Sequence, residues 1–243
     1  DPINNTVIDY SIQATSTAKG GGVDYTDVGS GQVTISSGQT TSDISININD
    51  DNLSEADETI ILDLISTTNS SIDFSGTTSH TLTIQDNDNA PEVSFTNASS
   101  SGSESSSPSI EVGVSPTSSD AITVDLAAIA GSPAATGGGT DYDLLSSSVT
   151  IPGGQSSIIL QGSTLSIVDD ILDEANEVVQ LSISNPTSSG PTPTLGGQTT
   201  HDYTINDDDP EPTLSFDNAS ATITEGNTTE AVRLSLSAAS GQD

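Results

Sequence analysis

Apolar residues in this chain recur at every second position, in short runs separated by turn-forming residues. Ile44, Ile46 and Ile48 alternate with polar residues, and the same alternation returns at residues 110–114 and 232–236. A period of two, with turn residues between the runs, is typical of half-buried strands in a β-sandwich. No run has the spacing of a helical stripe, and residues 55–58 could form one turn at most. The pattern therefore predicts an all-β fold.

The sequence also repeats itself, with a unit of about 120 residues. Asp24-Tyr25 matches Asp141-Tyr142, and the acidic stretch 50–58 matches 169–177. The block 83–88 matches 204–209, and 93–98 matches 214–219. Self-similarity at a fixed period indicates a tandem-repeat architecture. We therefore expect β-sandwiches that follow one another head to tail in an elongated array.

The matched blocks divide the chain into three parts. Residues 90–209 form a complete repeat, residues 1–89 lack the first two strands of a repeat, and residues 210–243 contain only those two strands. A sandwich without two of its strands exposes unpaired edges and half of its core. Two interpretations follow: the chain is a window of a longer array, or residues 210–243 complete the first repeat of a neighbouring copy by strand addition.

The strong negative charge of the chain excludes some classes of binding partner. The chain has 35 acidic residues against two basic ones, and a net charge of -33. Such a chain has no basic surface for nucleic acid or for anionic membranes. Only 31% of the residues are hydrophobic, which would also suit a disordered chain, but their regular alternation favours a fold. The sequence contains no cysteine, so disulfides and thiolate metal sites are excluded. No apolar run reaches the length of a membrane span.

The acidic stretches carry the chemistry that the sequence suggests. Asp50 and Asp51 have counterparts in Asp169 and Asp170, and each pair is followed by further acids at the same spacing. Carboxylates placed this closely repel one another unless a cation lies among them. Calcium accepts six to eight oxygen ligands of this kind. The spacing therefore predicts calcium in the loops of both repeats.

The order of these motifs resembles that of the Calx-β domain, and it occurs twice. The resemblance rests on the Asp-Tyr pair, the Gly-Gln turn, the acidic turn 173–177 and the closing block 204–209, and it extends to Glu225-Gly226. It implies an immunoglobulin-like sandwich of about seven strands, with calcium held by loops at one tip.

The resemblance also implies a ligand set. In the central repeat it comprises Glu104, Asp141, Asp169, Asp170, Glu174, Glu177, Asp207 and Asp208. In the first repeat it comprises Asp24, Asp50, Asp51, Glu55, Glu58, Asp86 and Asp88. The first repeat has no early glutamate of its own, and the equivalent residue is Glu225.

Evidence for catalysis is weak. His80 and His201 occupy equivalent positions before the last strand of each repeat, and we interpret both as scaffold residues. No Ser-His-Asp arrangement can be recognised by spacing among so many serines, and no Gly-rich loop precedes a helix. We therefore expect a protein that is not an enzyme.

The sequence favours a calcium-binding structural repeat of an extracellular or cell-surface fibre, stalk or adhesin. Calcium would stiffen the domains and their junctions, since Asp86 and Asp88 run into the short linker 89–92. We expect neighbouring copies or repeats as head-to-tail partners, and the sequence does not identify an adhesive ligand. The alternative is a calcium-sensing regulatory domain pair like those of sodium–calcium exchangers.

Overall fold

The computed structural model describes residues 4–26, 28, 31–68, 72–226 and 231–241. Over these residues every regular element is a β-strand, as the alternation predicts. The chain divides into two compact units, Asp1–Ala90 and Pro91–Asp243. We describe each unit by itself. No helix in the described ranges is long and apolar enough to cross a membrane.

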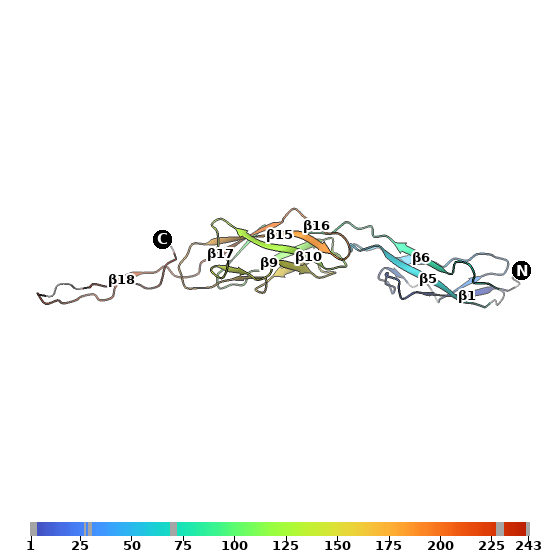
Figure 1. The fold of residues 1–243 in the computed structure, drawn as a ribbon, viewed down its shortest axis with the longest axis horizontal. Helices are drawn as coiled ribbons and strands as arrows, with labels where there is room; N and C mark the ends of the chain where they lie inside the picture. The colour runs from blue at the N-terminus through green and yellow to red at the C-terminus, as the bar shows by residue number, and fades with distance from the viewer. Residues whose placement is uncertain (1–3, 27, 29–30, 69–71, 227–230, 242–243) are drawn as a thin grey trace. The chain divides into compact units, whose positions relative to one another are not determined.

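The second unit contains a complete β-sandwich (Figure 1). One sheet has the order β12–β10–β15–β17–β8, and the other has the order β13–β9–β7–β16. The strands of the first sheet are β8 (Ser99–Ser103), β10 (Ile122–Ala130), β12 (Ser148–Ile151), β15 (Glu177–Ser188) and β17 (Thr200–Asn206). Those of the second are β7 (Glu92–Phe95), β9 (Ile110–Ser115), β13 (Ser157–Leu160) and β16 (Thr194–Leu195). A two-stranded ribbon of β11 (Tyr142–Leu144) and β14 (Leu165–Ile167) completes it.

The core lies between the two sheets because alternate side chains of each strand face inward. In β9, Ile110, Val112 and Val114 are buried while the residues between them are partly exposed. Residues of both sheets, including Phe95 and Leu181, belong to one buried cluster. The expected sandwich is therefore present. It has eleven strands, β7–β17, instead of about seven, because several edges are broken into short segments.

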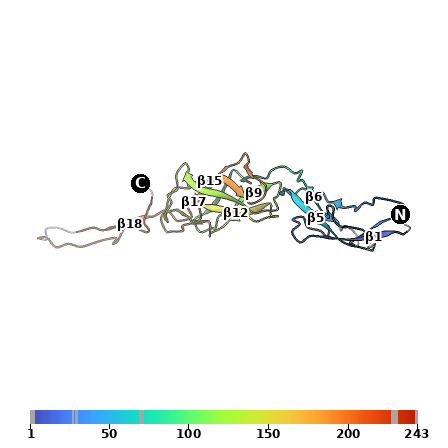
Figure 2. The same cartoon turned by 45° about the vertical axis from the view of Figure 1, so that its right-hand side comes forward.

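The first unit contains one of these two sheets. Its order β3–β1–β5–β6 repeats that of β12–β10–β15–β17, and Figures 1 and 2 both show β1, β5 and β6 side by side. Its strands are β1 (Thr6–Ile12), β2 (Tyr25–Thr26), β3 (Gln32–Ile35), β4 (Asn47–Ile48), β5 (Glu58–Thr67) and β6 (Ser79–Ile84). A small buried cluster holds it together: Tyr10, Ala18, Tyr25, Val28, Ile60 and Leu62.

Two sequence-based expectations differ from the structure. The strand expected around Ile44–Ile48 is reduced to β4, and residues 41–46 adopt no regular structure. Their counterpart in the central repeat, β13, is held by pairing with β9, and the first unit has no strand equivalent to β9 among its described residues. In addition, residues 92–115 contribute three strands, β7, β8 and β9, where the alternation predicted two.

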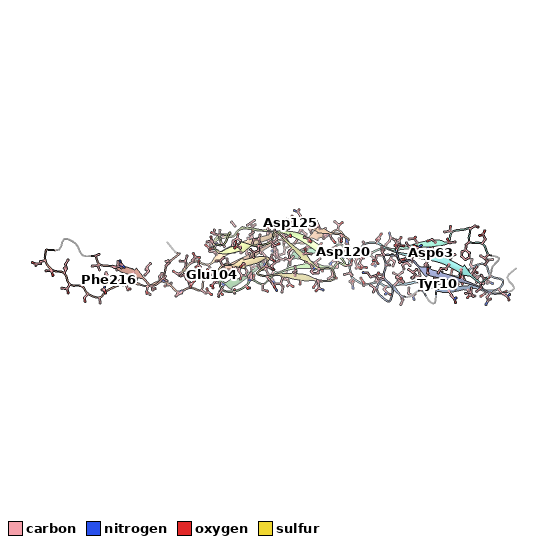
Figure 3. The ribbon with its side chains drawn as sticks, turned by 60° about the horizontal axis from the view of Figure 1, so that its bottom comes forward. Tyr10, Asp63, Glu104, Asp120, Asp125 and Phe216 are labelled. Carbon is pink, nitrogen blue, oxygen red and sulfur yellow. The ribbon has the colours of Figure 1, made fainter. Side chains whose placement is uncertain are left out.

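The C-terminal part of the second unit is a two-stranded hairpin of β18 (Leu214–Phe216) and β19 (Leu234–Leu236). Its apolar side chains are exposed, as Phe216 in Figure 3 illustrates. After β19 the chain returns to the central repeat: the Gly241 N–H donates to the Asp173 carbonyl oxygen over 3.0 Å, and Ser240 forms an isolated bridge with Asp173.

Candidate metal centres

Strand register brings the acidic loops of the central repeat to one end of the sandwich. β15 begins at Glu177, opposite Ile205 near the end of β17. β8 runs parallel to β17, and Ser103 lies opposite Asn206. The residues that follow β8 and β17 therefore meet the residues that precede β15. Figure 3 shows Glu104 at this end of the sandwich, which we call the central tip.

Five carboxylates at the central tip form two overlapping groups around Glu104. The oxygens of Glu104, Asp207 and Asp209 lie within 4.8 Å of one another, and so do those of Glu104, Asp169 and Asp208. Glu104 itself is only 8% exposed. A buried carboxylate that is shared by two acidic groups is unfavourable without a cation, because burial strengthens charge repulsion.

Hydrogen bonds to the backbone hold the loops of the central tip in place. The Glu104 N–H donates to the Asn206 carbonyl over 3.2 Å. The Glu174 N–H donates to Asp207 Oδ1, and the Asp207 N–H donates to Asn176 Oδ1, both over 3.1 Å. Each of the two loops therefore donates a hydrogen bond to the other. These bonds position the carboxylates before any ligand binds.

The remaining acids of the central tip lie beside these groups. Asp141 precedes β11 and accepts a hydrogen bond from the Thr136 N–H. Its carboxyl group also shares a hydrogen bond with Glu177. Asp170 Oδ1 accepts a hydrogen bond from the Leu172 N–H over 2.7 Å. Glu174 lies close enough to Asp141, Asp170 and Asp207 for their charges to act on it.

Burial, together with neighbouring carboxylates, raises the pKa values of several acids at the central tip. Burial, followed by the charges of Asp207 and Asp170, raises the pKa of Glu104 to about 7. Burial and the hydrogen bond with Asp141 raise the pKa of Glu177 to about 7. The pKa values of Glu174 and Asp209 are also raised, first by burial and then by neighbouring carboxylates. These are the directions expected when like charges share a site.

The first unit has an equivalent tip, which we call the first tip. β5 begins at Glu58, opposite Ile84 near the end of β6, so the same loops converge. Oxygens of Asp24, Glu55 and Glu58 lie within 4.8 Å of one another. A cavity of about 350 Å³ opens beside them. Its acidic lining contains all seven predicted residues: Asp24, Asp50, Asp51, Glu55, Glu58, Asp86 and Asp88.

The loops of the first tip are held as in the central repeat. The Asp86 N–H donates to Asp57 Oδ1 over 3.3 Å, which repeats the bond from Asp207 to Asn176. Asp24 is buried and accepts from the Lys19 N–H. The amide of Asn87 donates to Asp50 over 3.1 Å. Burial and the hydrogen bond with Asp24 raise the pKa of Glu58 to about 7, and burial with the charge of Asp24 raises that of Glu55.

The donors at both tips fit calcium. Every side chain in the three groups offers a carboxylate oxygen, the hard ligand that calcium prefers. Asp209 Oδ2 is buried and has no hydrogen-bond partner, although buried polar atoms are almost always paired. A cation beside Glu104, Asp207 and Asp209 would satisfy that oxygen and remove the repulsion between the three groups.

The structure brings fifteen of the sixteen predicted ligands to the two tips. Glu225 is different: it is exposed between β18 and β19, and it belongs to none of the acidic groups found in the described ranges. Asp209 was missed by the resemblance. The offset of 121 residues between the closing blocks could have identified it, since Asp209 is the counterpart of Asp88. The sequence analysis also did not identify Asp57 and Asn176, whose side chains hold the closing loops in place.

The match to a family model agrees with the two repeats of this architecture. The Calx-beta domain model matches residues 3–88 and again residues 86–209. No curated protein sequence matches the chain. A structure described as CBD12 from CALX1.2 is 18% identical, with a TM-score of 0.42, and the match covers 84% of this chain and 88% of that one. A structure described as calcium binding domain CBD12 of CALX1.1 is 16% identical, with a TM-score of 0.40 and coverages of 82% and 87%.

The family assignment rests on the two sequence matches, which together span most of the chain. They cover both tips and end with the closing aspartates of each repeat. The chain therefore belongs to the Calx-beta domain family and carries two consecutive Calx-beta domains.

Proposed function

We propose that the chain binds calcium at both tips, and that the ion holds together loops which otherwise repel one another. The observation that carries this proposal is the convergence of carboxylates on Glu104, with the unpaired Asp209 oxygen among them. The first tip supports it, because the same loops bring Asp24, Glu55 and Glu58 together. The donor types and their spacing are those of a calcium site.

We further propose that this binding serves a structural role in an extracellular or cell-surface fibre, stalk or adhesin. The closing aspartates of each repeat run directly into Pro-containing segments at 89–92 and 210–212, where proline already restricts the backbone. Calcium held by these loops would restrict the junctions further. The net charge of -33 supports such a role, since millimolar calcium outside cells would offset it. The role is not catalytic.

A calcium-sensing regulatory domain pair is the second candidate. The two consecutive family matches favour it, because a tandem pair could pass a calcium-induced change from one domain to the next. Affinity separates the two candidates. Sensors bind calcium with dissociation constants of about 10⁻⁷–10⁻⁵ M, whereas extracellular modules bind at about 10⁻⁴–10⁻³ M.

Isothermal titration calorimetry of the chelated protein tests both points. Calcium uptake should disappear from the central tip in Glu104→Gln and from the first tip in Glu58→Gln. Asp125→Asn and Asp43→Asn remove one exposed charge in the same units without touching either tip, and they should bind as the unmodified chain does. Absence of uptake at millimolar calcium would contradict the proposal, and micromolar affinity would favour the sensor.

A further inference from the structure

A proline directly follows the last of the closing aspartates of the central repeat. The bond between Asp209 and Pro210 lies in the irregular segment after β17, and Pro210 is exposed to solvent. Proline makes this bond a tertiary amide, and its nitrogen has no proton to donate to a hydrogen bond. The Asp209 carboxylate and the carbonyl group of this bond are attached to the same Cα. A carboxylate nucleophile therefore lies beside an accessible peptide bond.

The three closing aspartates of the central repeat are not held alike. Asp207 Oδ1 accepts a hydrogen bond from a backbone N–H of the acidic turn over 3.1 Å. Asp208 Oδ2 accepts one from the Ser105 hydroxyl over 2.7 Å. Asp209 Oδ2 is buried without a hydrogen-bond partner, beside the carboxylates of Glu104 and Asp207. Like charges favour separation, so these neighbours press the Asp209 carboxylate away from the tip when no cation lies among them.

Attack by this carboxylate on its own backbone would cleave the chain. A carboxylate oxygen of Asp209 forms a bond to the Asp209 carbonyl carbon, and the bond from that carbon to the Pro210 nitrogen breaks. The nitrogen leaves as a secondary amine with a proton from solvent, and Asp209 is left as a cyclic anhydride. Water then opens the anhydride and restores both carboxyl groups. The net reaction is hydrolysis with water as the only co-reactant, and the attack is favoured because the nucleophile is already in place.

The first repeat has the same closing block without the proline. Asp88 is the counterpart of Asp209, 121 positions earlier, and it is followed by Asn89. Asp88 lines the cavity of the first tip together with the other acids of that tip. The amide nitrogen of Asn89 is a less basic leaving group than the prolyl nitrogen, so we expect the bond after Asp88 to stay intact. The two junctions therefore form a natural pair for comparison.

We propose that the chain cleaves itself at the Asp209–Pro210 bond when the central tip is empty, and that calcium bound at this tip protects the bond. A carboxylate that coordinates calcium has its oxygens turned towards the ion and does not attack its own backbone. Cleavage would separate the central repeat from residues 210–243, so the integrity of this junction would depend on calcium. The protection rests on the proposed function, whereas the cleavage itself does not.

Incubation of the purified chain in calcium or in chelator tests the protection, in one buffer and below the unfolding temperature. Intact-mass spectrometry should detect fragments 1–209 and 210–243 in chelator. At a calcium concentration of about ten times the dissociation constant, roughly one tip in ten stays empty, so cleavage should slow about tenfold. Equal rates in a sample that takes up calcium in calorimetry would overturn the protection and leave the proposed function standing. Absence of calcium uptake would contradict both.

Exchanging the two junctions tests the cleavage. Pro210→Asn should abolish the fragments, and Asn89→Pro should create a new cut after Asp88. Asp209→Glu keeps the charge, but its attack would close a larger ring, so cleavage should slow at least about tenfold. Circular dichroism before incubation checks that each variant is folded.

Three results would overturn self-cleavage. The first is an unmodified chain that stays intact in chelator, and the second is an Asp209→Glu variant that is cut as fast as the unmodified chain. The third is a rate that falls when protease inhibitors are added, since this would reveal a contaminating enzyme. A rate per molecule that does not change with protein concentration would support cleavage within one chain.

Discussion

The two units of the chain use nearly the same sheet in different surroundings. The sheet β12–β10–β15–β17 faces a second sheet, and eighteen buried residues form the core between them. The sheet β3–β1–β5–β6 has no such partner in the described part of its unit, and six buried residues form its core. His201 is buried where its counterpart His80 is exposed. Burial at a given repeat position thus depends on the opposite layer more than on the residue itself.

The tips differ less than the cores. One hydrogen bond that positions the closing aspartates occurs in both repeats, from the Asp86 N–H to Asp57 and from the Asp207 N–H to Asn176, because it is made between neighbouring loops. In the described part of the first unit, no residue takes the place of Glu104, which follows β8. The site geometry is therefore largely independent of the completeness of the sandwich.

The largest expected effect on stability comes from replacing the phenylalanines at equivalent positions of β7 and β18. Phe95→Ala should lower the free energy of unfolding of the central repeat by about 3–5 kcal/mol, because it removes a buried aromatic side chain and leaves a cavity. Phe216→Ala should change it by less than about 0.5 kcal/mol in dilute protein, because that ring is exposed. Urea unfolding at low protein concentration measures both. Equal losses would contradict the difference between the two hairpins.

Calcium linkage should give the next largest effect. Asp170→Ala should lower the melting temperature of the central repeat in calcium and change it little in chelator. A ligand at 100 times its dissociation constant stabilises the fold by about 2.7 kcal/mol per site. Asp51→Ala is the matched change in the first tip, and we expect a smaller drop because no counterpart of Glu104 assists binding there. Calorimetric scans with and without chelator make the comparison. A drop of the same size in both conditions would indicate a purely structural acid.

Replacing the two equivalent histidines by alanine should give a smaller difference in stability. His201→Ala removes the partners of the Asn97 carbonyl and of the Ser100 hydroxyl, which lies 2.8 Å from Nε2. We expect a loss of about 1–3 kcal/mol, the usual effect of leaving buried polar groups unpaired. His80→Ala should have almost no effect in dilute protein. Thermal unfolding of the two variants decides this, and a large effect at His80 would show that its face is covered.

The last comparison is a pH dependence in chelator. Glu104 and Glu177 have pKa values raised from 4.5 to about 7 in the folded state. Between these pH values the folded chain holds protons that the unfolded chain has lost. Stability is therefore greatest below pH 4.5 and falls as the pH rises through about 7. The first tip has one group whose pKa is raised to about 7, Glu58. The stability of the first unit should therefore fall less steeply with pH. Unfolding measured from pH 4.5 to 8 tests this, and Glu104→Gln should flatten the central slope.

The sequence predicted the fold well where the signal is local. Alternation of apolar residues identified β9 and β19, and the repeated acidic turns identified the two tips, because both patterns depend on strand and loop geometry within a few residues. The strand around Ile44 was predicted by the same alternation, yet residues 41–46 form none. A strand also needs a neighbour to pair its backbone groups, and the neighbour comes from a distant part of the chain.

The sequence by itself determined the all-β class, the repeat length and most of the carboxylates at each tip, since these follow from periodicity and spacing. Only the tertiary structure decided that Glu104 lies in two acidic groups at once, that the Asp209 oxygen is buried without a partner, and that the described residues of the first unit line an apolar groove. The physical reason is that burial and charge repulsion depend on which strands become neighbours. Register between residues about 100 positions apart sets those contacts, as between Ser103 and Asn206.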